Sequence, residues 1–421
     1  MTPLSPLDAL NAFRDMLPAR PRLYVAGCSG EPLAIVEAFR SAPDLAAGVT
    51  FFGIWIPGVN QTDWAGLHPG ARAESIFIGP NLRDSFVEGR TDFLPLSYTQ
   101  SWEWLSSTPA DGAIVMVSAP DAQGQVSLGV SADFSPALLE RHDVPALALI
   151  NPALPAPVDG PRVDLDRFTI IAQADTPLIQ VPSASLPDTF RHIGSHIANL
   201  VSPGDTLQFG LGNVQQAVLN ALHTHRDLRI HSGMISDPLL DLLDSGAVSS
   251  CRGSIVTGVA IGTDPLYARV SADPCFSFRA VAHTHALSTL AGLRGLKAIN
   301  SAIEVDLFGQ ANAEFIGGRQ VSGTGGLVDF MRGAAAARQG RAITALASSA
   351  KGGTLSRIVP RLAPDATSIA RADMDTVVTE HGVAELKNRS IDQRAAALIE
   401  IAAPQFRDQL ANDWDAMRRA M

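Results

Sequence analysis

Short apolar runs alternate along this chain with segments of helical periodicity, and glycines stand at many of the junctions between them. Apolar, β-branched runs of this length are typical of buried strands, whereas apolar residues spaced three and four apart are typical of helices. We therefore predict strands at 22–30 (ending in a glycine turn), 49–55, 76–78, 111–118, 144–151, 206–211 and 298–307. We predict helices at 5–20, 31–39, 188–200 and 214–222.

The order of these elements indicates an α/β fold. A strand that runs into a glycine turn and then a helix is the opening of an α/β unit, and a series of such units begins twice along the chain. The proline-rich stretch 151–161 cannot form regular structure and is interpreted as a linker or crossing loop. We predict two tandem α/β domains, over 1–185 and 186–421.

Composition narrows the possible partners. The chain has 421 residues, 46% of them hydrophobic, and a formal net charge of −10, which disfavours nucleic acid and an anionic membrane surface. Three widely spaced cysteines suit a reducing compartment and no metal knuckle. No signal peptide and no apolar run long enough to span a membrane is apparent, so a cytoplasmic protein is expected.

Two glycine-rich junctions are candidate binding sites. Gly323, Gly325 and Gly326 lie within five residues, and Gly210 and Gly212 precede Asn213 at the start of a predicted helix. Glycines allow backbone N–H groups to converge on one point, and a helix N-terminus attracts negative charge. Either junction could bind a phosphate or a developing oxyanion. The alternative is a tight turn between two core elements.

The segment 299–333 carries the most specific motif, because it runs through polar residues that no generic strand requires. It resembles the acetyl-CoA hydrolase/transferase family, which includes the 4-hydroxybutyrate, succinate–acetate and itaconate CoA-transferases. The segments 89–95, 117–131 and 356–404 extend the resemblance over nearly all of the chain. The matching residues of 299–333 are Asn300, Glu304, Asp306, Gly309, Gln310, Asn312, Glu314, Gly323, Gly325, Gly326, Asp329 and Phe330.

The resemblance implies a fold, a cofactor and a reaction. Family members have two CoA-transferase domains (NagB/RpiA-like) and exchange coenzyme A between a small acyl-CoA and a carboxylate. A homodimer is implied, and no metal. The CoA thioester would contact Asn300 and two glycine loops. One loop contains Gly210, Gly212 and Asn213, and the other contains Gly323, Gly325 and Gly326. A family glutamate attacks the thioester and forms a covalent glutamyl-CoA intermediate.

The family glutamate is missing here. It lies in a segment like H-T-E-M-x-S-D, and this chain has His231-Ser232-Gly233-Met234-Ile235-Ser236-Asp237, with Gly233 at the glutamate position. Glycine leaves space there unless a substrate or a neighbouring residue fills it. Three interpretations stay open: another group does the chemistry, the protein binds CoA or acyl-CoA without turnover, or the segment is shifted against the family motif and a nearby carboxylate serves.

Several residues could substitute for the glutamate. Ser232 and His231 are adjacent, and Glu304, Glu314 and Asp237 are carboxylates on the motif segments. His285 falls where the family has a substrate-contacting Asn or His, and an extended His283-Thr284-His285 would put both imidazoles on one side of a strand. A histidine base that activates water would give a thioester hydrolase. The alternative for the two histidines is a structural role or a zinc site. The alternative for Glu304 and Asp306 is that they only pair with a buried arginine.

Overall fold

The computed structural model describes residues 2–183, 185–364 and 367–421. The chain forms two compact units, each assembled from segments that are not contiguous in sequence. Unit 1 comprises Met1–Pro182, Cys251–Thr284 and Val321–Gly325, and unit 2 comprises Ser183–Ser250, His285–Gln320 and Gly326–Met421. The domain boundary near 185 stays a prediction, because a domain that folds by itself is a stronger statement than a compact unit.

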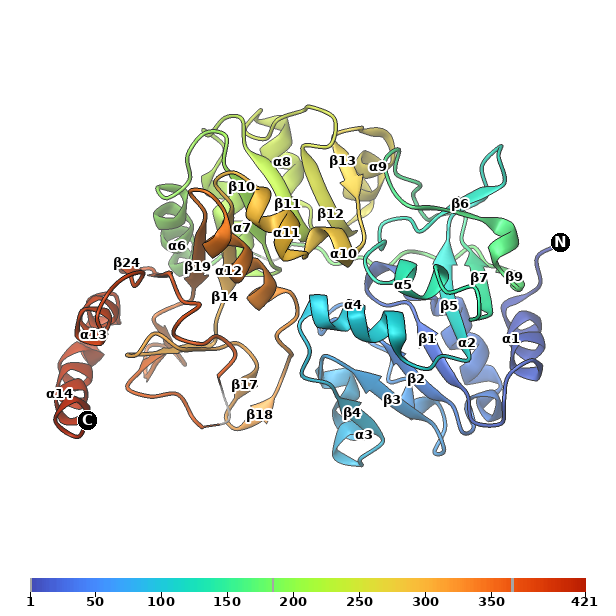
Figure 1. Cartoon of the computed structure of the whole chain (residues 1–421), viewed down its shortest axis with the longest axis horizontal. Helices are drawn as coiled ribbons and strands as arrows, with labels where there is room; N and C mark the ends of the chain where they lie inside the picture. Colours follow the sequence, from blue (N-terminus) through green and yellow to red (C-terminus); the bar gives the residue numbers. More distant parts are fainter. Residues whose placement is uncertain (1, 184, 365–366) are drawn as a thin grey trace. The chain divides into compact units, whose positions relative to one another are not determined.

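Unit 1 is built on a parallel seven-stranded sheet with the order β4-β3-β2-β1-β5-β7-β9 (Figure 1). Every residue of β5 and β7 is buried, which explains why these strands are continuously apolar: helices cover a parallel sheet on both faces. The strands are β1 (Arg22–Val25), β2 (Thr50–Gly53), β3 (Arg72–Ser75), β4 (Thr91–Phe93), β5 (Gly112–Val117), β7 (Ala146–Ile150) and β9 (Ile170–Gln173).

In the described residues, unit 1 also contains seven α-helices and two short strand pairs. The Ser97 hydroxyl and the Gln100 side chain form a reciprocal capping box that fixes the start of α4. The helices are α1 (Pro6–Asp15), α2 (Leu33–Ser41), α3 (Arg83–Val87), α4 (Tyr98–Ser107), α5 (Ser135–Leu139), α9 (Asp264–Ala272) and α10 (Val281–Thr284). The pairs are β6 (Gln125–Ser127) with β8 (Arg162–Asp164), antiparallel, and β12 (Ile255–Ala260) with β13 (Phe276–Phe278), parallel.

Unit 2 has the strand order β11-β10-β14-β19-β23-β24. Its strands run parallel except for the last, β24, which is antiparallel to β23. The strands are β10 (Thr206–Phe209), β11 (Arg229–Ile235), β14 (Lys297–Ser301), β19 (Arg341–Ala345), β23 (Thr376–Thr379) and β24 (Gly382–Glu385). The helices are α6 (Asp188–Ala198), α7 (Asn213–Ala221), α8 (Pro238–Asp244), α11 (Leu287–Gly292), α12 (Leu327–Ala336), α13 (Ile391–Glu400) and α14 (Arg407–Arg419).

Short strands extend unit 2 beyond its main sheet. Among the helices of unit 2, α6 contacts α7 and α7 contacts α8. Helix α11 packs on α12, and α12 contacts the main-sheet strands β14 and β19. A buried cluster of Leu296, Phe330, Met331 and Trp414, among others, forms the core of this region. The short strands are β15 (Glu304–Asp306), β16 (Ala311–Asn312), β17 (Phe315–Ile316), β18 (Arg319–Gln320), β20 (Ser349–Ala350), β21 (Leu355–Ser356) and β22 (Ile358–Val359).

The structure confirms the predicted α/β class and most of the predicted elements, with two corrections. The strand predicted at 298–307 is two strands, because the chain leaves the main sheet after Ser301 and β15 pairs instead with β16 and β22. The strand predicted at 76–78 is wrong, since β3 ends at Ser75. Residues 76–78 are apolar because they are buried, although they make no strand pairing.

The described residues contain neither a helix fit to span a membrane nor a cluster of metal ligands. None of the helices there combines the length and the apolar character needed to cross a membrane. Within the same residues, no group of three or more His, Cys, Asp or Glu side chains is arranged to hold a metal ion.

Candidate functional site

Strand β11 of unit 2 carries three of the predicted site residues in a row. His231 is 2% exposed and Ser232 is fully buried. The Ser232 hydroxyl donates a hydrogen bond to the carbonyl oxygen of Phe209 at 2.8 Å, and the Phe209 N–H points back to Ser232 Oγ at 3.4 Å. Side chains alternate along a strand, so His231 and position 233 share the face opposite to Ser232. Ser232 therefore fastens β11 to the end of β10.

The space beside Gly233 is already occupied. An ideal Cβ placed on Gly233 would lie 3.0 Å from Cε1 and 3.1 Å from Nε2 of His285, and 3.8 Å from Cε2 of Phe330. Contacts at 3.0–3.1 Å are tighter than almost all real Cβ contacts, so a side chain at 233 requires the imidazole to shift. A neighbouring residue, His285, thus fills the space that the sequence left open.

The same imidazole is pressed against the start of α12. A Cβ on Gly326 would overlap His285 Nε2 and would lie 3.5 Å from Phe330 Cε2. Gly326 is the N-cap of α12, and its φ of −84° is open to any residue, so the close approach of His285 is what requires a glycine here. The rings of His285 and Phe330 lie 4.5 Å apart at 56°. His285 is therefore held between β11 and the first turn of α12.

Burial determines the charge of His285. The side chain is 2% exposed, and burial, followed by the proximity of His231, lowers the pKa of His285 to about 3. The N-terminus of α12 has the same effect, because the positive end of a helix dipole disfavours an imidazolium. His285 is a neutral imidazole throughout the physiological pH range.

The prediction that His283 and His285 project from one side of an extended strand is wrong. Val281–Thr284 form a single helical turn, α10, in which the N–H groups of His283 and Thr284 both donate to the Ala280 carbonyl oxygen. This turn leaves His283 exposed, whereas His285 follows the helix and is buried. The two histidines do not form a pair, and only His285 lies at Gly233.

The glycine turn after β10 is open. Gly212 has φ +100° and ψ −165°, a conformation that strongly favours glycine, and it is the N-cap of α7. An added Cβ at Gly210 or Gly212 would meet nothing within 4 Å. No side chain caps α7, so the N–H groups of its first turn, which begins at Asn213, face this open space.

Asn300 lies on β14, next to the strand that leads into this turn. Its amide Nδ2 donates to Gln208 Oε1 at 3.0 Å, and Gln208 Nε2 donates to Asn300 Oδ1 at 3.3 Å. Both side chains are buried. On the other side of the turn, Gln215 of α7 donates to Ser236 Oγ at 2.8 Å. These amides fix the geometry of β10, β14 and α7 around the open turn.

The second glycine loop is tightly packed. A Cβ on Gly323 would overlap the carbonyl oxygen of Ile76, and Gly325 has φ +52° with Phe77 and Tyr98 against it, all within unit 1. The Tyr98 N–H donates to the Gly325 carbonyl oxygen at 3.2 Å. These glycines are required by close backbone approach, and an anion-binding role for Gly323 and Gly325 stays a prediction.

The motif carboxylates have local partners. Glu304 Oε2 accepts from Asn312 Nδ2 at 3.3 Å, across the β15–β16 pair. Asp306 is buried and accepts from the N–H groups of Phe308 and Gln310 and from Gln310 Nε2. Neither Glu304 nor Asp306 is paired with an arginine in the part of the chain that the structure describes. The alternative of a buried arginine partner is therefore not supported.

Sequence reasoning did not assign a site role to Phe330, which packs on His285. Phe330 was part of the matched motif, and it stands four residues after Gly326, so one helical turn places it beside the N-cap. That spacing was the available signal.

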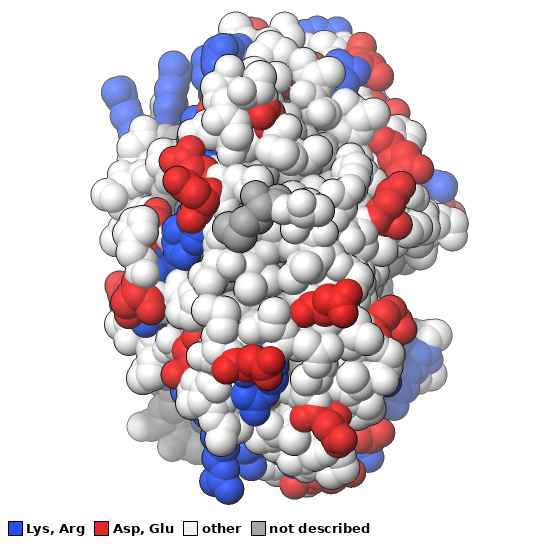
Figure 2. All heavy atoms as spheres, turned by 90° about the vertical axis from the view of Figure 1, so that its right-hand side faces the viewer, with Lys and Arg blue, Asp and Glu red and all other residues white. Residues whose placement is uncertain are grey.

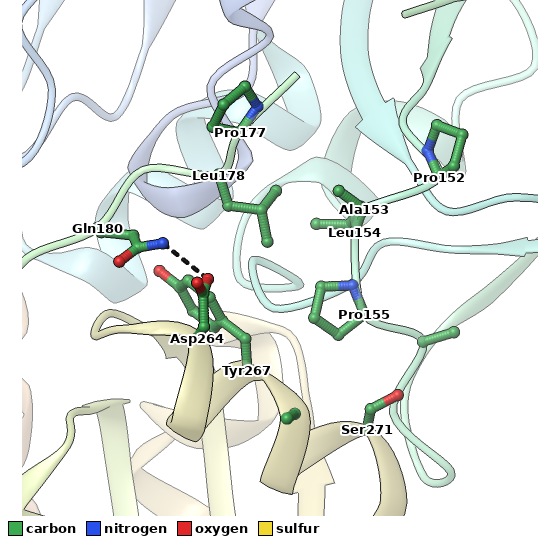
Figure 3. A pocket seen from close by; sticks show the side chains of 12 residues that line it. Pro152, Ala153, Leu154, Pro155, Pro177, Leu178, Gln180, Asp264, Tyr267 and Ser271 are labelled. Atoms are coloured by element: carbon green, nitrogen blue, oxygen red, sulfur yellow. Dashed lines mark hydrogen bonds between the residues drawn. The ribbon is translucent and has the colours of Figure 1, made fainter. Parts of the chain in front are cut away.

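Unit 1 contains a cavity of about 550 Å³ that holds none of the predicted site residues (Figure 3). Its wall includes Pro152, Leu154 and Pro155 of the proline-rich stretch, and Tyr267 of α9. Figure 3 shows the hydrogen bond from Gln180 Nε2 to Asp264 Oδ1, 2.7 Å long, at one edge. Gln180, Asp264, Tyr267 and Ser271 add polar groups to the prolines and Leu154 of this wall.

Charge is dispersed over the face of the molecule drawn in Figure 2. Acidic side chains lie scattered among uncharged residues there, and the described lysines and arginines do not merge into one basic area on that face. A polyanionic ligand on this acidic protein needs local attraction, which the uncapped N-terminus of α7 can supply.

Comparisons with known proteins now bear on this site. Residues 15–156 match the family model of the acetyl-CoA hydrolase/transferase N-terminal domain, and residues 262–414 match that of its C-terminal domain. The chain is 34% identical over 401 residues to the 4-hydroxybutyrate coenzyme A transferase of Clostridium kluyveri, covering 93% of each protein. The chain belongs to the acetyl-CoA hydrolase/transferase family.

Two further comparisons agree with membership of the acetyl-CoA hydrolase/transferase family. The succinyl-CoA:cyclohexane-1-carboxylate CoA transferase of Geobacter metallireducens is 33% identical over 83% of this chain and 82% of its own. The crystal structure of RipA from Yersinia pestis has a TM-score of 0.89 and 27% identity over 99% of this chain and 97% of its own. The predicted family, the CoA-transferase type of fold, and the expectation of an enzyme family of transferases and hydrolases are confirmed.

Proposed function

We propose that this protein transfers coenzyme A between a small acyl-CoA thioester and a carboxylate acceptor without forming a glutamyl-CoA intermediate at position 233. The observation that carries the proposal is that Gly233 has no side chain and that His285 lies directly against it. The motif places the family glutamate at 233, yet a glycine stands there and the buried imidazole of His285 fills the adjacent space. The family relationship supports the CoA-transfer reaction.

The open turn after β10 is the proposed binding site for the thioester. Gly210 and Gly212 leave room for close approach, and the uncapped N–H groups at the start of α7 can donate to a phosphate or a carbonyl oxygen. Asn300, locked to Gln208, orients the floor of the turn. In this proposal Ser232 and Glu304 support the site, since their side chains bond to Phe209 and Asn312.

The chemistry then proceeds directly between the two substrates. The acceptor carboxylate attacks the thioester carbonyl, forming a C–O bond and releasing the CoA thiolate, which gives a mixed anhydride. The thiolate attacks the acceptor carbonyl of this anhydride, forming the new thioester and releasing the original acid as a carboxylate. Backbone N–H groups stabilise the oxyanion of each tetrahedral intermediate. No proton or electron is gained or lost overall.

Kinetic order tests this proposal. A direct reaction needs both substrates bound together, so initial rates measured against acyl-CoA at several acceptor concentrations should give intersecting double-reciprocal lines. A covalent enzyme would give parallel lines. After incubation with acyl-CoA and borohydride reduction, peptide mass analysis should find no modified glutamate. Parallel lines together with a CoA adduct on any carboxylate would refute the proposal.

Hydrolysis is the second candidate. The family includes acetyl-CoA hydrolases, and without an enzyme carboxylate water can take the place of the acceptor. The low pKa of His285, about 3, argues against it as the general base, because such an imidazole takes up a proton poorly near neutral pH. Release of free thiol in the absence of any acceptor would identify a hydrolase. Tight CoA binding with neither reaction would identify a binding protein.

A further inference from the structure

Another cavity, of about 450 Å³, lies in unit 2 and is lined by none of the residues proposed to bind the thioester. Its wall includes Phe308, which is 7% exposed, and two exposed arginines, Arg361 and Arg371. Their guanidinium carbons lie 5.0 Å and 5.6 Å from the centroid of the Phe308 ring, and Trp414 of α14 packs edge-on against that ring. Arg361 Nε also approaches the sulfur of Met417, a weak acceptor, at 3.2 Å. One aromatic ring thus holds two cations in the wall of the cavity.

A third guanidinium approaches this pair. Arg394 of α13 donates from Nη1 to the carbonyl oxygen of Arg371 at 2.7 Å. The same nitrogen would lie 3.0 Å from a Cβ on Gly309, the residue after Phe308. Burial, followed by the charge of Arg371, lowers the pKa of Arg394. Like charges therefore repel each other here, and a negative charge among them would relieve that repulsion.

The carboxylates near these arginines have other partners. Asp306, in the wall of the cavity, accepts from the backbone N–H of Gln310 at 2.9 Å and from its Nε2 at 3.0 Å. Asp375, whose charge favours the protonated form of Arg394, pairs with Lys387 at 3.6 Å. Among the described residues, no carboxylate forms an ion pair with any of the three arginines. The chain has 42 acidic and 32 basic residues, so arginines that gather without a carboxylate point to an anion from outside the chain.

We infer that Arg361 and Arg371 bind the phosphate group of a small ligand in this cavity. Guanidinium N–H donors form a fork that fits the oxygens of a phosphate. A phosphate group carries a charge of about −1.5 to −2 near neutral pH and so offsets more of the repulsion among three arginines than a carboxylate does. Contact with the Phe308 ring restricts both side chains before the ligand arrives, which lowers the entropy lost on binding. The inference does not rest on the proposed function.

Inorganic phosphate is the probe for this site, titrated into the full chain by calorimetry at low ionic strength, because salt screens exposed charges. Wild-type protein should bind it. Arg361→Met and Arg371→Met should each weaken binding by about 10-fold or more, the scale of a lost hydrogen bond to a charged group. Methionine keeps an unbranched, apolar side chain against Phe308 but carries no charge. Arg361→Lys keeps a charge without the planar fork, so it should retain part of the affinity.

The matched control is Arg338→Met, which removes the same charge from an exposed position that does not line the cavity. This variant should bind phosphate as wild type does. Thermal unfolding shows that each variant is folded and supplies a second readout. Phosphate should raise the Tm of wild type and of the control, and it should raise the Tm of the two cavity variants less.

A comparison of coenzyme A with 3′-dephospho-CoA identifies the source of the phosphate. If wild type prefers coenzyme A and Arg371→Met abolishes that preference, the site holds the 3′-phosphate of coenzyme A. Phosphate binding at the arginines without such a preference assigns the site to a separate phosphorylated ligand. The inference is overturned if wild type does not bind inorganic phosphate, or if both cavity variants bind it as tightly as wild type. A protein that exchanges no CoA but shows this phosphate binding would contradict the proposed function alone.

Discussion

In both units a glycine turn follows the strand at which the strand order of the sheet reverses. One of these turns is closely packed and the other is open. In unit 1 the strand order reverses at β1, which lies between β2 and β5, and in unit 2 it reverses at β10, between β11 and β14. Ligands of open α/β sheets bind at the carboxyl ends of strands at such points. Both turns therefore qualify as binding sites by topology alone.

Packing distinguishes them. After β1, a Cβ on Gly27 would overlap the Ile54 carbonyl oxygen, one on Gly30 would lie 2.9 Å from Ser131 Cβ, and Cys28 is buried with φ +53°. Asn60 accepts from the Cys28 N–H and donates to the Cys28 carbonyl oxygen. After β10, Gly210 and Gly212 face open space. The sheet topology indicates where a ligand could bind, and the packing around the glycine turn determines whether there is space for that ligand.

Substituting one glycine in each turn should show the largest difference between the two turns, measured as the free energy of unfolding. Gly27→Ala forces a Cβ into a backbone oxygen that cannot move aside, so we expect a loss of about 3 kcal/mol or more in the free energy of unfolding. Gly210→Ala should change stability by less than about 1 kcal/mol, because the site is open. Urea denaturation measures both.

The same pair separates stability from binding. Gly210→Ala should weaken CoA binding in calorimetry by placing a methyl group where the ligand approaches. Equal destabilisation by the two substitutions would show that the turn after β10 is packed as closely as that after β1.

Position 233 offers the second test, in which a carboxylate is placed at the position where the resemblance puts the family glutamate. Gly233→Glu alone should not create transferase activity through a covalent enzyme, because its Cβ meets His285 at 3.0 Å. Gly233→Glu combined with His285→Ala removes that obstacle. We expect the double variant to form a glutamyl-CoA adduct and to exceed Gly233→Glu by about 10²-fold in transferase rate, the scale of one well-placed catalytic group.

Mass analysis of the 225–240 peptide after borohydride treatment detects the adduct, and parallel double-reciprocal lines would confirm the changed kinetic order. A double variant that folds and binds CoA yet forms no adduct would mean that position 233 does not face the thioester.

The smallest expected effect depends on pH and comes from Asp133, which lies beside the closed turn: Ser131 Oγ is within hydrogen-bond distance of both the Gly27 carbonyl oxygen and Asp133 Oδ1. Burial raises the pKa of Asp133 from 3.8 to about 6. The folded state therefore holds more protons than the unfolded state between those values, and this carboxyl lowers stability as pH rises from about 4 to 6. Asp133→Asn should gain about 1–2 kcal/mol at pH 7 and nothing at pH 3.

His285 has the opposite sign, because its pKa is lowered to about 3. The unfolded state then holds more protons between pH 3 and 6.5, so stability rises with pH across that window, and His285→Ala removes this dependence. Urea denaturation at several pH values follows both residues. A gain in Asp133→Asn that is the same at pH 3 and pH 7 would contradict the shift.

Local patterns predicted the elements better than their partners. The strand–glycine–helix junction at β10 and α7 was found from the sequence because its turn chemistry is local. The strand at 298–307 was wrong because the switch of β15 to a second sheet depends on β22, far along the chain. For the same reason the flanking motif could point to Gly233 as a candidate, which stays a prediction, but the ring beside it could not be foreseen. His285 reaches it only through the turn of α10, which was predicted as extended.

The close fit of Gly323 against Ile76 also bears on how the chain is synthesised. The chain passes between the two units five times, the last time between Gly325 and Gly326. Unit 1 therefore lacks one of its own segments until Val321–Gly325 has been synthesised, and about half of unit 2 precedes that segment in the chain. Neither unit can reach its final packing as an independent amino-terminal product, and the two must mature late and together.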